Sequence, residues 1–383
     1  MRTRLLFLFP ALAAALWAAP GAAVTVRNPL DLARPSETVV LDAAQLRTML
    51  TVDNVQKVHV RAQGSDTDLL VQAVDTNDDG VYDQLLFQAD FTPHQTRVFD
   101  LTVGARQIAM AGDYKTYGRF VRERRDDFAW ENDRIAHRMY GKELETFPRD
   151  KLISSSVDVW TKRVRNLVIN NWYMVDDYHK DHGEGADLYA AGATRGNGGT
   201  GIQVAGKLYT STNFRTSKVF AVGPIRVLFE LTYDAWDAGG VQVSEKKVVS
   251  LDAGQNLDRF ESHYTIEGNA ANLTHAIGLR RLKDTLREPA KEPGVLVTWE
   301  PVKEGGELGQ AVIVDPAAVK QQAEDDLNYY VLTKIEPGAP CVSYSGFAWT
   351  TAGDFKTAGD WERYVSGFAA RLRSPLEVKL EKR

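Results

Sequence analysis

The sequence is poor in cysteine and has no excess of basic charge. Cys341 is the one thiol among 383 residues, so no disulfide can form within the chain and the fold must be held by its core. The net charge is −5, with Lys and Arg dispersed, which argues against the concentrated positive surface that nucleic acid requires. After residue 23 no apolar run is long enough to cross a bilayer, so we expect no transmembrane span in the mature chain.

The N-terminus has the layout of a secretory signal peptide. Arg2 and Arg4 precede an apolar run over residues 5–17, and small residues follow up to Ala23. The apolar run is short for a membrane span, although an uncleaved anchor is the alternative. We therefore expect residues 1–23 to be removed, with cleavage near Ala23, and the protein to be periplasmic or secreted.

What the sequence has in abundance is short strand-like runs. Residues 24–110 contain alternating or continuous apolar runs, which predict a small N-terminal β-sandwich with one short helix at 42–50. Over residues 111–383 such runs follow at short spacing, which predicts a larger antiparallel sandwich or barrel. Within it, residues 225–233 place alternate apolar side chains on one face, as a half-buried strand does. These side chains are Ile225, Val227, Phe229, Leu231 and Tyr233.

Two further helices are predicted late in the chain. One covers residues 315–328. The other begins at the capping pattern Thr357-x-x-Asp360, carries apolar and aromatic residues at helical spacing, and stops before Pro375. Its aromatic stripe indicates core packing and not a ligand site.

One stretch, residues 178–201, concentrates side chains that carry chemistry. It holds two histidines together with acids, tyrosines, an arginine and several glycines. A turn needs only Gly with Asp or Asn, whereas His beside carboxylates and Tyr can transfer protons near neutral pH. We predict His182 as the catalytic base or acid and Tyr178 as its partner, with His179 and Glu184 as substrate-binding residues. The alternative is a long solvated loop.

The same stretch also contains patterns that resemble metal and nucleotide sites. The HxxH spacing of His179 and His182, with acids nearby, raises zinc, but Gly183 and Gly185 disfavour the helix that would align such ligands. Residues 196–201 match GxGxxG, yet the residues that follow alternate like a strand, so a nucleotide site is rejected. The glycines would instead let backbone approach a ligand or bend the loop across a cleft.

Residues 75–83 match the opening of a calcium loop, with oxygen-bearing side chains on alternate residues and Gly80 for the sharp turn. Position twelve is Leu86, where an EF-hand needs Glu, and the flanks read as strands. A plain Asp-Gly hairpin explains the same residues. A structural calcium ion and a simple hairpin both stay open, and no other cofactor is expected to be required. The candidate calcium ligands are Asp75, Asn77, Asp79 and Asp83.

A second polar group comes from residues 130–140. If this run is one strand, alternation places a set of polar and aromatic side chains on one face, either as a cleft floor that binds a uronate or as a solvated sheet face. His137 lies on the opposite face and is expected to be packed. The set is Trp130, Asn132, Arg134, Arg138 and Tyr140.

Four blocks of sequence, at residues 126–141, 158–164, 170–189 and 223–236, resemble the bacterial DUF4861 family, and the resemblance extends over nearly all of the mature chain. The family is similar in architecture to galactose-mutarotase-like supersandwiches, the fold of aldose epimerases and of domains of several polysaccharide lyases. It is associated with polysaccharide breakdown, including a dehydratase that acts on unsaturated ulvan oligosaccharides. The resemblance therefore implies a supersandwich for residues 111–383 and a sugar substrate. It assigns no catalytic residue, and His137 departs from the aromatic residue expected there.

These observations lead to the hypothesis of an exported carbohydrate-active enzyme, a dehydratase or lyase that eliminates water or a glycosidic oxygen from uronate-containing oligosaccharides. Elimination beside a carboxylate needs a base for the α-proton and a cation or amide for the developing charge. Arg134 and Asn132 would bind the carboxylate, and Arg195 would clamp the sugar ring. The alternatives are an aldose epimerase and a non-catalytic sugar-binding protein that keeps Trp130 and Trp172. The oligomeric state is not predicted.

Overall fold

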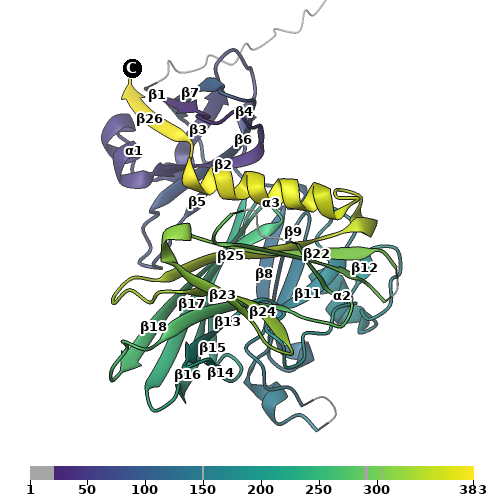
Figure 1. Ribbon diagram of the computed structural model, residues 1–383. Coiled ribbons are helices and arrows are strands. Elements are labelled where there is room, and N and C mark those ends of the chain that lie inside the picture. The colour runs from purple at the N-terminus through teal and green to yellow at the C-terminus, as the bar shows by residue number, and fades with distance from the viewer. Residues whose placement is uncertain (1–20, 149–150, 289–291, 304) are drawn as a thin grey trace, which may run out of the picture.

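The computed structural model describes residues 21–148, 151–288, 292–303 and 305–383. The chain is mainly β, and its antiparallel sheets form a small sandwich and a large supersandwich, as predicted (Figure 1). The expected signal peptide lies almost wholly outside the described residues. Ala22 and Ala23 are buried and paired on both sides in the first strand, and cleavage near Ala23 stays a prediction.

The small sandwich is built from two sheets that enclose a core of Val, Leu and Phe side chains. Helix α1 (Ala43–Leu50) closes one end, and its N-cap Asp42 accepts a hydrogen bond from the backbone N–H of Gln45, which satisfies one of the helix's first donors. One sheet has the order β26 (Glu377–Lys382), β1 (Ala22–Arg27), β7 (Thr96–Val103), β3 (Val58–Ala62) and β4 (Asp68–Leu69), and the other has the order β2 (Arg34–Asp42), β6 (Gln84–Phe91) and β5 (Val71–Val74).

The C-terminal strand belongs to this small sandwich. Strand β26 pairs with β1 along its whole length, from Ala22 opposite Lys382 to Arg27 opposite Glu377. The first unit is therefore made from both ends of the chain, which the division into 24–110 and 111–383 does not anticipate.

The supersandwich places one long sheet against two shorter ones. The long sheet has the order β15 (Thr216–Ala221), β16 (Arg226–Asp237), β17 (Gln242–Asp252), β18 (Leu257–Glu267), β25 (Cys341–Trp349), β22 (Glu307–Val314), β21 (Val295–Pro301) and β20 (Leu286–Glu288). One short sheet has the order β12 (Gly185–Ala186), β11 (Asp158–Lys162), β10 (Ala136–Met139), β9 (Asp127–Asn132) and β8 (Thr116–Val121), and the other has the order β14 (Lys207–Tyr209), β13 (Asn197–Val204), β19 (Thr274–Arg280), β24 (Asn328–Thr333) and β23 (Val319–Glu324).

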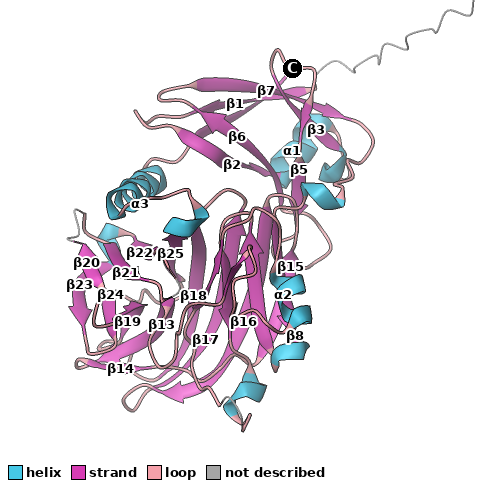
Figure 2. Ribbon diagram, turned by 90° about the vertical axis from the view of Figure 1, so that its right-hand side faces the viewer, coloured by secondary structure: helices cyan, strands magenta, loops and turns pink. Residues whose placement is uncertain are grey.

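The main core lies between the long sheet and the sheet of β8 to β12. The predicted apolar face of residues 225–233 is buried in it, with Val227, Phe229 and Leu231 fully inaccessible. Helix α3 (Ala358–Arg373) covers the outer face of the long sheet and lies between the two sandwiches (Figure 2). It starts at the predicted capping box of Thr357 and Asp360 and buries Trp361 against the sheet.

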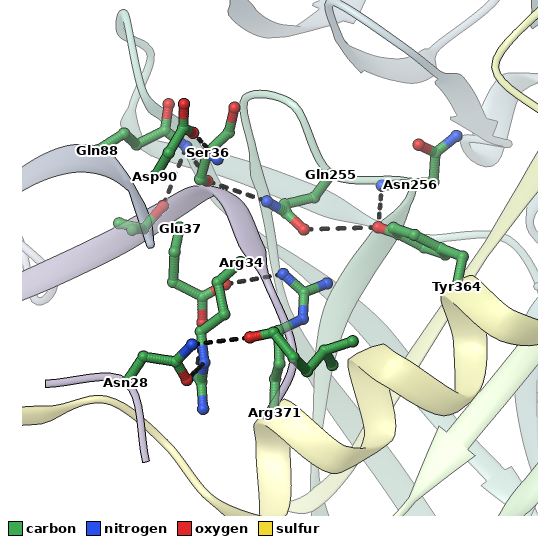
Figure 3. Close-up of polar contacts among 12 residues, drawn as sticks. Asn28, Arg34, Ser36, Glu37, Gln88, Asp90, Gln255, Asn256, Tyr364 and Arg371 are labelled. Carbon is green, nitrogen blue, oxygen red and sulfur yellow. Dashed lines mark hydrogen bonds and ion pairs between the residues drawn. The ribbon is translucent and has the colours of Figure 1, made fainter. Parts of the chain in front are cut away.

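Polar contacts lock α3, the small sandwich and the long sheet together (Figure 3). Arg371 of α3 donates to the Glu37 carboxylate of β2 at 2.7 Å, and Arg34 donates to the same carboxylate at 3.1 Å. Gln255, which precedes β18, donates to the backbone carbonyl of Ser36 at 3.0 Å. The backbone N–H of Asn256 donates to the Tyr364 hydroxyl of α3 at 2.9 Å. These contacts join three separate elements at one junction.

Two predicted elements are wrong. Residues 166–175, one of the strand-like runs counted within residues 111–383, form helix α2 (Ile169–Val175) instead, because the buried Glu131 carboxylate of β9 accepts the N–H groups of Val168 and Ile169 at its first turn. The helix expected at 315–328 is a short 3₁₀ turn, Pro316–Ala318, followed by β23. Strand β23 pairs with β24 and so satisfies an edge that would otherwise be open. Both outcomes depend on contacts from distant parts of the chain.

The run 130–140 is a hairpin and not one strand. β9 ends at Asn132, a turn follows, and β10 begins at Ala136, with Trp130 opposite His137 and Ala129 opposite Arg138. The reversal sends Trp130 and Arg138 to opposite faces of the sheet, so the expected shared polar face does not exist.

Candidate functional site

Two clefts of about 480 Å³ each open on the molecule. One lies at the junction of the two sandwiches, where Arg226 pairs with Asp252 at 2.6 Å and Arg371 pairs with Glu37 at 2.7 Å. Its charges are matched one to one. In the other, which we call the Arg138 cleft, three buried carboxylates surround the Arg138 guanidinium, and this buried cluster of titratable groups marks it as the candidate site. It is lined by Arg124, Asp127, Arg138, Tyr140, Leu144, Leu152, His179, Asp187, Leu188, Tyr189, Ala190, Ala191, Gly192 and Lys303.

Neighbouring strands of one sheet bring the charged groups of the Arg138 cleft together. Arg138 on β10 stands directly opposite Asp158 on β11, and Asp127 is the first residue of β9 on the other side. Asp187 follows the two-residue strand β12, which pairs with the far end of β11. Gly185 in β12 has φ of +110°, and a Cβ there would lie 2.1 Å from the Thr161 carbonyl oxygen, so only glycine permits this close pairing.

The Arg138 guanidinium is the centre of the cleft. Its Nε and Nη2 donate to Asp158 Oδ2 at 3.0 and 2.6 Å, and Nη2 also donates to Asp187 Oδ2 at 2.9 Å. Asp127 Oδ2 lies 3.6 Å from Nη1. The guanidinium carbon also lies 5.2 Å from the ring centres of Tyr140 and Trp160, within range of a cation–π contact. One cation thus serves three acids.

Burial inside this cluster shifts the pKa values of the acids. Burial raises the pKa of Asp187 to about 8, and the nearby charge of Asp158 adds to the rise while Arg138 opposes it. Burial likewise raises the pKa of Asp127 to about 7 against the opposing charges of Arg138 and Arg124. Burial alone would lower the pKa of Arg138, but Asp158 and Asp187 raise it well above its usual value. The pKa of Asp187 thus lies above 7, so the cleft offers a carboxylic acid that keeps its proton near neutral pH, a requirement for a general acid.

Tyrosines and His179 complete this side of the cleft. Tyr173 donates from its hydroxyl to Asp127 at 3.1 Å, and the Arg124 guanidinium donates to the Tyr178 hydroxyl. The backbone carbonyl of Tyr178 accepts the N–H of Asp187 at 2.7 Å. His179 is largely exposed at the rim, and its Nδ1 contacts the backbone carbonyl of Asp187 and lies equally far, 3.4 Å, from Asp187 Oδ2. An imidazole and a neutral carboxylic acid therefore face each other at the opening.

The predicted residues of the 178–201 stretch divide between two places. His179 and the separately predicted Arg138 line the Arg138 cleft, and Tyr178 lies against its wall. His182 lies elsewhere: its Nε2 contacts Asp177 at 2.7 Å, and more than half of its side chain is exposed. Together with Trp172 and Glu184, which share a 3.1 Å hydrogen bond, it lines a separate pocket of about 140 Å³ on the other side of Tyr178. Tyr178 directs its hydroxyl to Arg124, so it is not positioned as the partner of His182.

Three predicted residues of the 130–140 run lie outside the cleft. Trp130 is fully buried and donates to Asp258 at 2.6 Å, so it offers no open ring face to a sugar. Asn132 is fully buried and holds the hairpin turn by accepting the N–H groups of Arg134 and Ile135. Arg134 sits in that turn and pairs with Asp354 at 3.0 Å. Each is used by the fold because the chain reverses where a continuous strand was expected.

His137 is packed, as predicted. It is fully buried on the inner face, where its Nδ1 lies 3.0 Å from Asp258 and its ring lies 5.4 Å from that of Trp130.

Arg195 is also internal. Its Nη1 donates to the Ser155 hydroxyl at 3.1 Å and to the Thr200 carbonyl at 3.2 Å, and it is 4% exposed. It cannot clamp a ligand from that position. The glycines that follow it begin strand β13, which agrees with the rejection of a nucleotide site. They allow backbone segments to approach each other: a Cβ on Gly196 would lie 2.0 Å from the Val157 carbonyl oxygen.

The predicted calcium loop is the turn between β5 and β6. Asp75 accepts the N–H groups of Asp78 and Gly80 at 2.7 and 2.8 Å, and Asp83 accepts both the N–H and the hydroxyl of Thr76 at 2.7 Å. Asn77 and Asp79 accept hydrogen bonds within the same turn. In the part of the chain that the structure describes, no group of three or more His, Cys, Asp or Glu side chains is placed to hold a metal ion. Calcium here stays a prediction.

Sequence reasoning missed Asp127, Asp158, Tyr189 and Lys303. Asp127 and Asp158 begin strands, and acids at strand ends resemble solvated surface in a sequence. A faint signal was present, because both lie in the blocks that resemble DUF4861, next to Phe128 and Val159. Asp187 is one of the acids near His179 and His182 that raise zinc in the sequence, and the sequence gives it no role in proton transfer.

Comparison with known proteins gives a family and a fold. A family model described as "Domain of unknown function (DUF4861)" matches residues 26–378. A curated protein of Formosa agariphila, "Uncharacterized protein P7", is 34% identical over 374 residues, which are 94% of this chain and 93% of that protein.

Two solved structures from Enterococcus faecalis share the fold. An alpha-mannosidase has a TM-score of 0.52 at 8% identity, and a protein in glycosyl hydrolase family 38 has a TM-score of 0.54 at 9% identity. Each likeness covers 94% of this chain but 46% and 47% of the mannosidase and the family 38 protein. The chain thus spans about half the length of these proteins. Among the described residues no helix is long and apolar enough to span a membrane.

Proposed function

The chain belongs to the DUF4861 family, and from that premise we propose that it is an exported carbohydrate-active enzyme whose reaction takes place in the Arg138 cleft. The reaction is an elimination of water or of a glycosidic oxygen from a uronate-containing, unsaturated oligosaccharide. The observation that carries the proposal is the pairing of a buried acid, Asp187, whose pKa is raised to about 8, with the exposed imidazole of His179 at 3.4 Å.

The cleft has the parts that elimination needs. Arg138 is engaged by three acids, and Lys303 and Arg124, which donates to the Tyr178 hydroxyl, add positive charge to the lining of the cleft. These cations would hold the uronate carboxylate and stabilise the negative charge that develops on it. The Tyr140 and Tyr189 rings line the same cleft and supply flat apolar surface for a sugar ring.

His179 and Asp187 divide the proton transfers. In a uronate residue of the oligosaccharide that is still saturated, His179 takes the proton from the carbon next to the carboxylate, and the electron pair forms the new carbon–carbon double bond as the carbon–oxygen bond one atom further on breaks. Asp187 gives its proton to the departing oxygen, which leaves as water or as a sugar hydroxyl. The imidazolium can then return a proton to the carboxylate, since the two groups face each other across 3.4 Å. The pair is thereby restored without a cofactor.

The comparisons support the substrate class at a coarser level. The solved proteins of the same fold are named as a mannosidase and a glycosyl hydrolase, so a saccharide substrate agrees with the fold. Fold alone does not select a reaction. The acid and the imidazole also suit an aldose epimerase, and a sugar-binding protein would use the same tyrosines and cations without proton transfer.

Mass spectrometry tests the reaction. The purified chain is incubated with unsaturated oligosaccharides from ulvan, pectin and glycosaminoglycans, and products are examined for loss of one water or for shorter unsaturated chains. We expect one of these products, and we expect Asp187→Asn and His179→Ala to lower kcat/KM by about 10²–10⁴-fold, the usual contribution of general acid/base catalysis. Because Asp187 acts as an acid, wild-type kcat/KM should decline as pH rises past about 8.

His182→Ala is the matched control, since it removes a neighbouring histidine outside the cleft, and its kcat/KM should stay within a few-fold of wild type. Saturated shorter products would indicate hydrolysis, and a change of optical rotation alone would indicate an epimerase. Binding without any product would leave a sugar-binding protein. Full activity of Asp187→Asn would refute the assignment of the acid.

A further inference from the structure

One wall of the Arg138 cleft is supported from behind by a buried ion pair. The wall is the segment 188–192, which follows Asp187 and lines the cleft along its whole length. The Arg280 guanidinium carbon lies 3.4 Å from the centre of the Tyr189 ring, and Arg280 does not itself line the cleft. Both side chains belong to residues that are only 5% exposed. Arg280 therefore stands behind the tyrosine, inside the protein.

Arg280 also holds the backbone of the wall. Its Nη1 donates to the Ala190 carbonyl at 3.0 Å, while its Nε donates to the Glu300 carboxylate at 2.8 Å. The second oxygen of Glu300 accepts the Thr285 hydroxyl at 2.8 Å. The Tyr189 hydroxyl is held separately, donating to Gln310 at 2.8 Å. The ring, its hydroxyl and the next carbonyl are thus each held by a different interaction.

These supports come from outside the sheet that carries the acids. Arg280 ends strand β19 and Glu300 lies in β21, whereas Arg138 and Asp158 lie in β10 and β11. A buried ion pair adds little net stability compared with apolar packing. Its fork of hydrogen bonds instead fixes geometry, because a guanidinium donates in set directions.

We propose that Arg280 and Glu300 are positioning residues that fix the Tyr189–Ala190 wall and thereby set the affinity of the cleft for a sugar ring. The part that concerns sugar affinity rests on the proposed function, while the positioning of the wall does not. Neither residue touches the reacting atoms, so the effect is expected in KM and not in kcat.

Hydrogen–deuterium exchange of segment 188–192 tests the positioning without any substrate. In Arg280→Gln we expect these amides to exchange about tenfold faster or more than in wild type, since local opening reports the lost support. Arg281→Gln is the matched control, because Arg281 is the adjacent arginine but donates to the Asp325 carbonyl on the other side. Its exchange in segment 188–192 should equal that of wild type. Glu300→Gln, which keeps the shape and removes the charge, should give an intermediate increase.

Kinetics with a uronate trisaccharide tests the consequence. We expect Arg280→Gln to raise KM about tenfold with kcat within about threefold, the split expected when binding contacts and not transition-state contacts are lost. Tyr189→Leu, which removes the ring but leaves Arg280 its partners Ala190 and Glu300, should raise KM similarly. If Arg280→Gln does not fold, Arg280→Lys is used, because it keeps the charge and loses the fork.

The two ideas fail separately. Unchanged exchange of segment 188–192 in a folded Arg280 variant would overturn the positioning role whatever the kinetics show. Faster exchange combined with an unchanged KM would overturn the role in affinity. If wild type turns over no uronate, the proposed function fails, while the exchange experiment still decides whether Arg280 holds the wall.

Discussion

At the scale of single residues, the raised pKa of Asp187 affects both its proposed role as a general acid and the stability of the fold. Its carboxyl is almost fully buried beside a second acid, and its pKa is raised to about 8. Holding an acid neutral in this way favours the folded state only while the acid is protonated. The property that would make Asp187 a general acid near neutral pH must therefore cost stability once the proton is lost.

Replacing Asp187 by Asn tests this link. The folded pKa, about 8, lies above the unfolded value of about 3.9. The stabilisation is thus fully present below about pH 4 and is lost as pH rises through about 8. We expect the Tm of wild type to fall relative to that of Asp187→Asn between pH 5 and pH 8.5, by about 1–2 °C for each kcal/mol in a chain of this length. Calorimetry across this range measures the difference.

Asp181→Asn provides the control for that measurement. Asp181 lies in the same segment, but there the N–H groups of Gly183 and Gly185 and the charge of Arg163 outweigh partial burial and lower its pKa. Its Tm difference from wild type should not show the same drift between pH 5 and pH 8.5. Parallel curves for wild type and Asp187→Asn would mean that Asp187 ionises as an ordinary surface acid.

The site residues show how far single-residue reasoning reaches. Arg138 and His179 were predicted and lie in the Arg138 cleft. The predicted sugar-stacking role of Trp130 was wrong because it assumed that residues 130–140 form one strand with alternating faces. The turn between β9 and β10 interrupts that alternation, so Trp130 and Arg138 lie on opposite faces. Asp127 and Asp158 were missed for another reason: each becomes unusual only through burial beside the other acids, and a sequence contains no information on that neighbour.

At the scale of elements, the sequence predicted the helices whose first turns are stabilised by residues next to them in the chain. The capping box of α3 and the cap of α1 lie within one turn of the helices they start, and both helices were predicted. Helix α2 and strand β23 were not, because each is fixed by a distant strand: β9 through Glu131 for α2, and β24 for β23. An element whose conformation depends on contacts with distant residues cannot be predicted from local sequence alone.

The turn between β5 and β6 yields a prediction about metal. Asp75 accepts two short N–H hydrogen bonds within the turn, so Asp75→Ala should lower the Tm even without calcium. If the sequence pattern reports a calcium loop, millimolar calcium should raise the Tm of wild type but not of Asp75→Ala, as for weak extracellular sites. Thermal melts in calcium and in EDTA measure both effects. A wild-type Tm that is the same in the two solutions would leave a plain Asp-Gly hairpin.

At the scale of the whole molecule, the first and last strands of the described chain pair with each other. β1 lies between β7 and β26, so the strand that begins the described chain needs the strand that ends it (Figure 1). Helix α3 immediately precedes β26 and joins the long sheet to the small sandwich through Tyr364 and Arg371. The small sandwich therefore cannot be complete until the last residues are available, whereas the Arg138 cleft uses no residue after Lys303.

Deleting residues 376–383 tests whether the small sandwich depends on the C-terminal strand while the Arg138 cleft does not. The deletion removes β26 and leaves β1 with an open edge, while α3 and its contacts remain. We expect the small sandwich to lose several kcal/mol, at about 0.5–1.5 kcal/mol for each ladder hydrogen bond, and to melt in a separate, earlier transition. The open edge should also promote association. Calorimetry together with hydrogen exchange of residues 22–103 would assign the early transition to the small sandwich. At temperatures below that transition the Arg138 cleft should keep its activity.

The paired control removes the charge contact without the strand. Arg27→Ala breaks only the exposed ion pair with Glu377, which at this exposure contributes less than about 1 kcal/mol, so its melt should stay close to that of wild type. If the deletion variant melts in a single transition at the wild-type Tm, β26 does not hold the small sandwich. If instead both sandwiches melt together at a lower temperature, the contact between Glu37 and Arg371 couples their unfolding strongly. A change at either end of the chain would then destabilise the Arg138 cleft through α3.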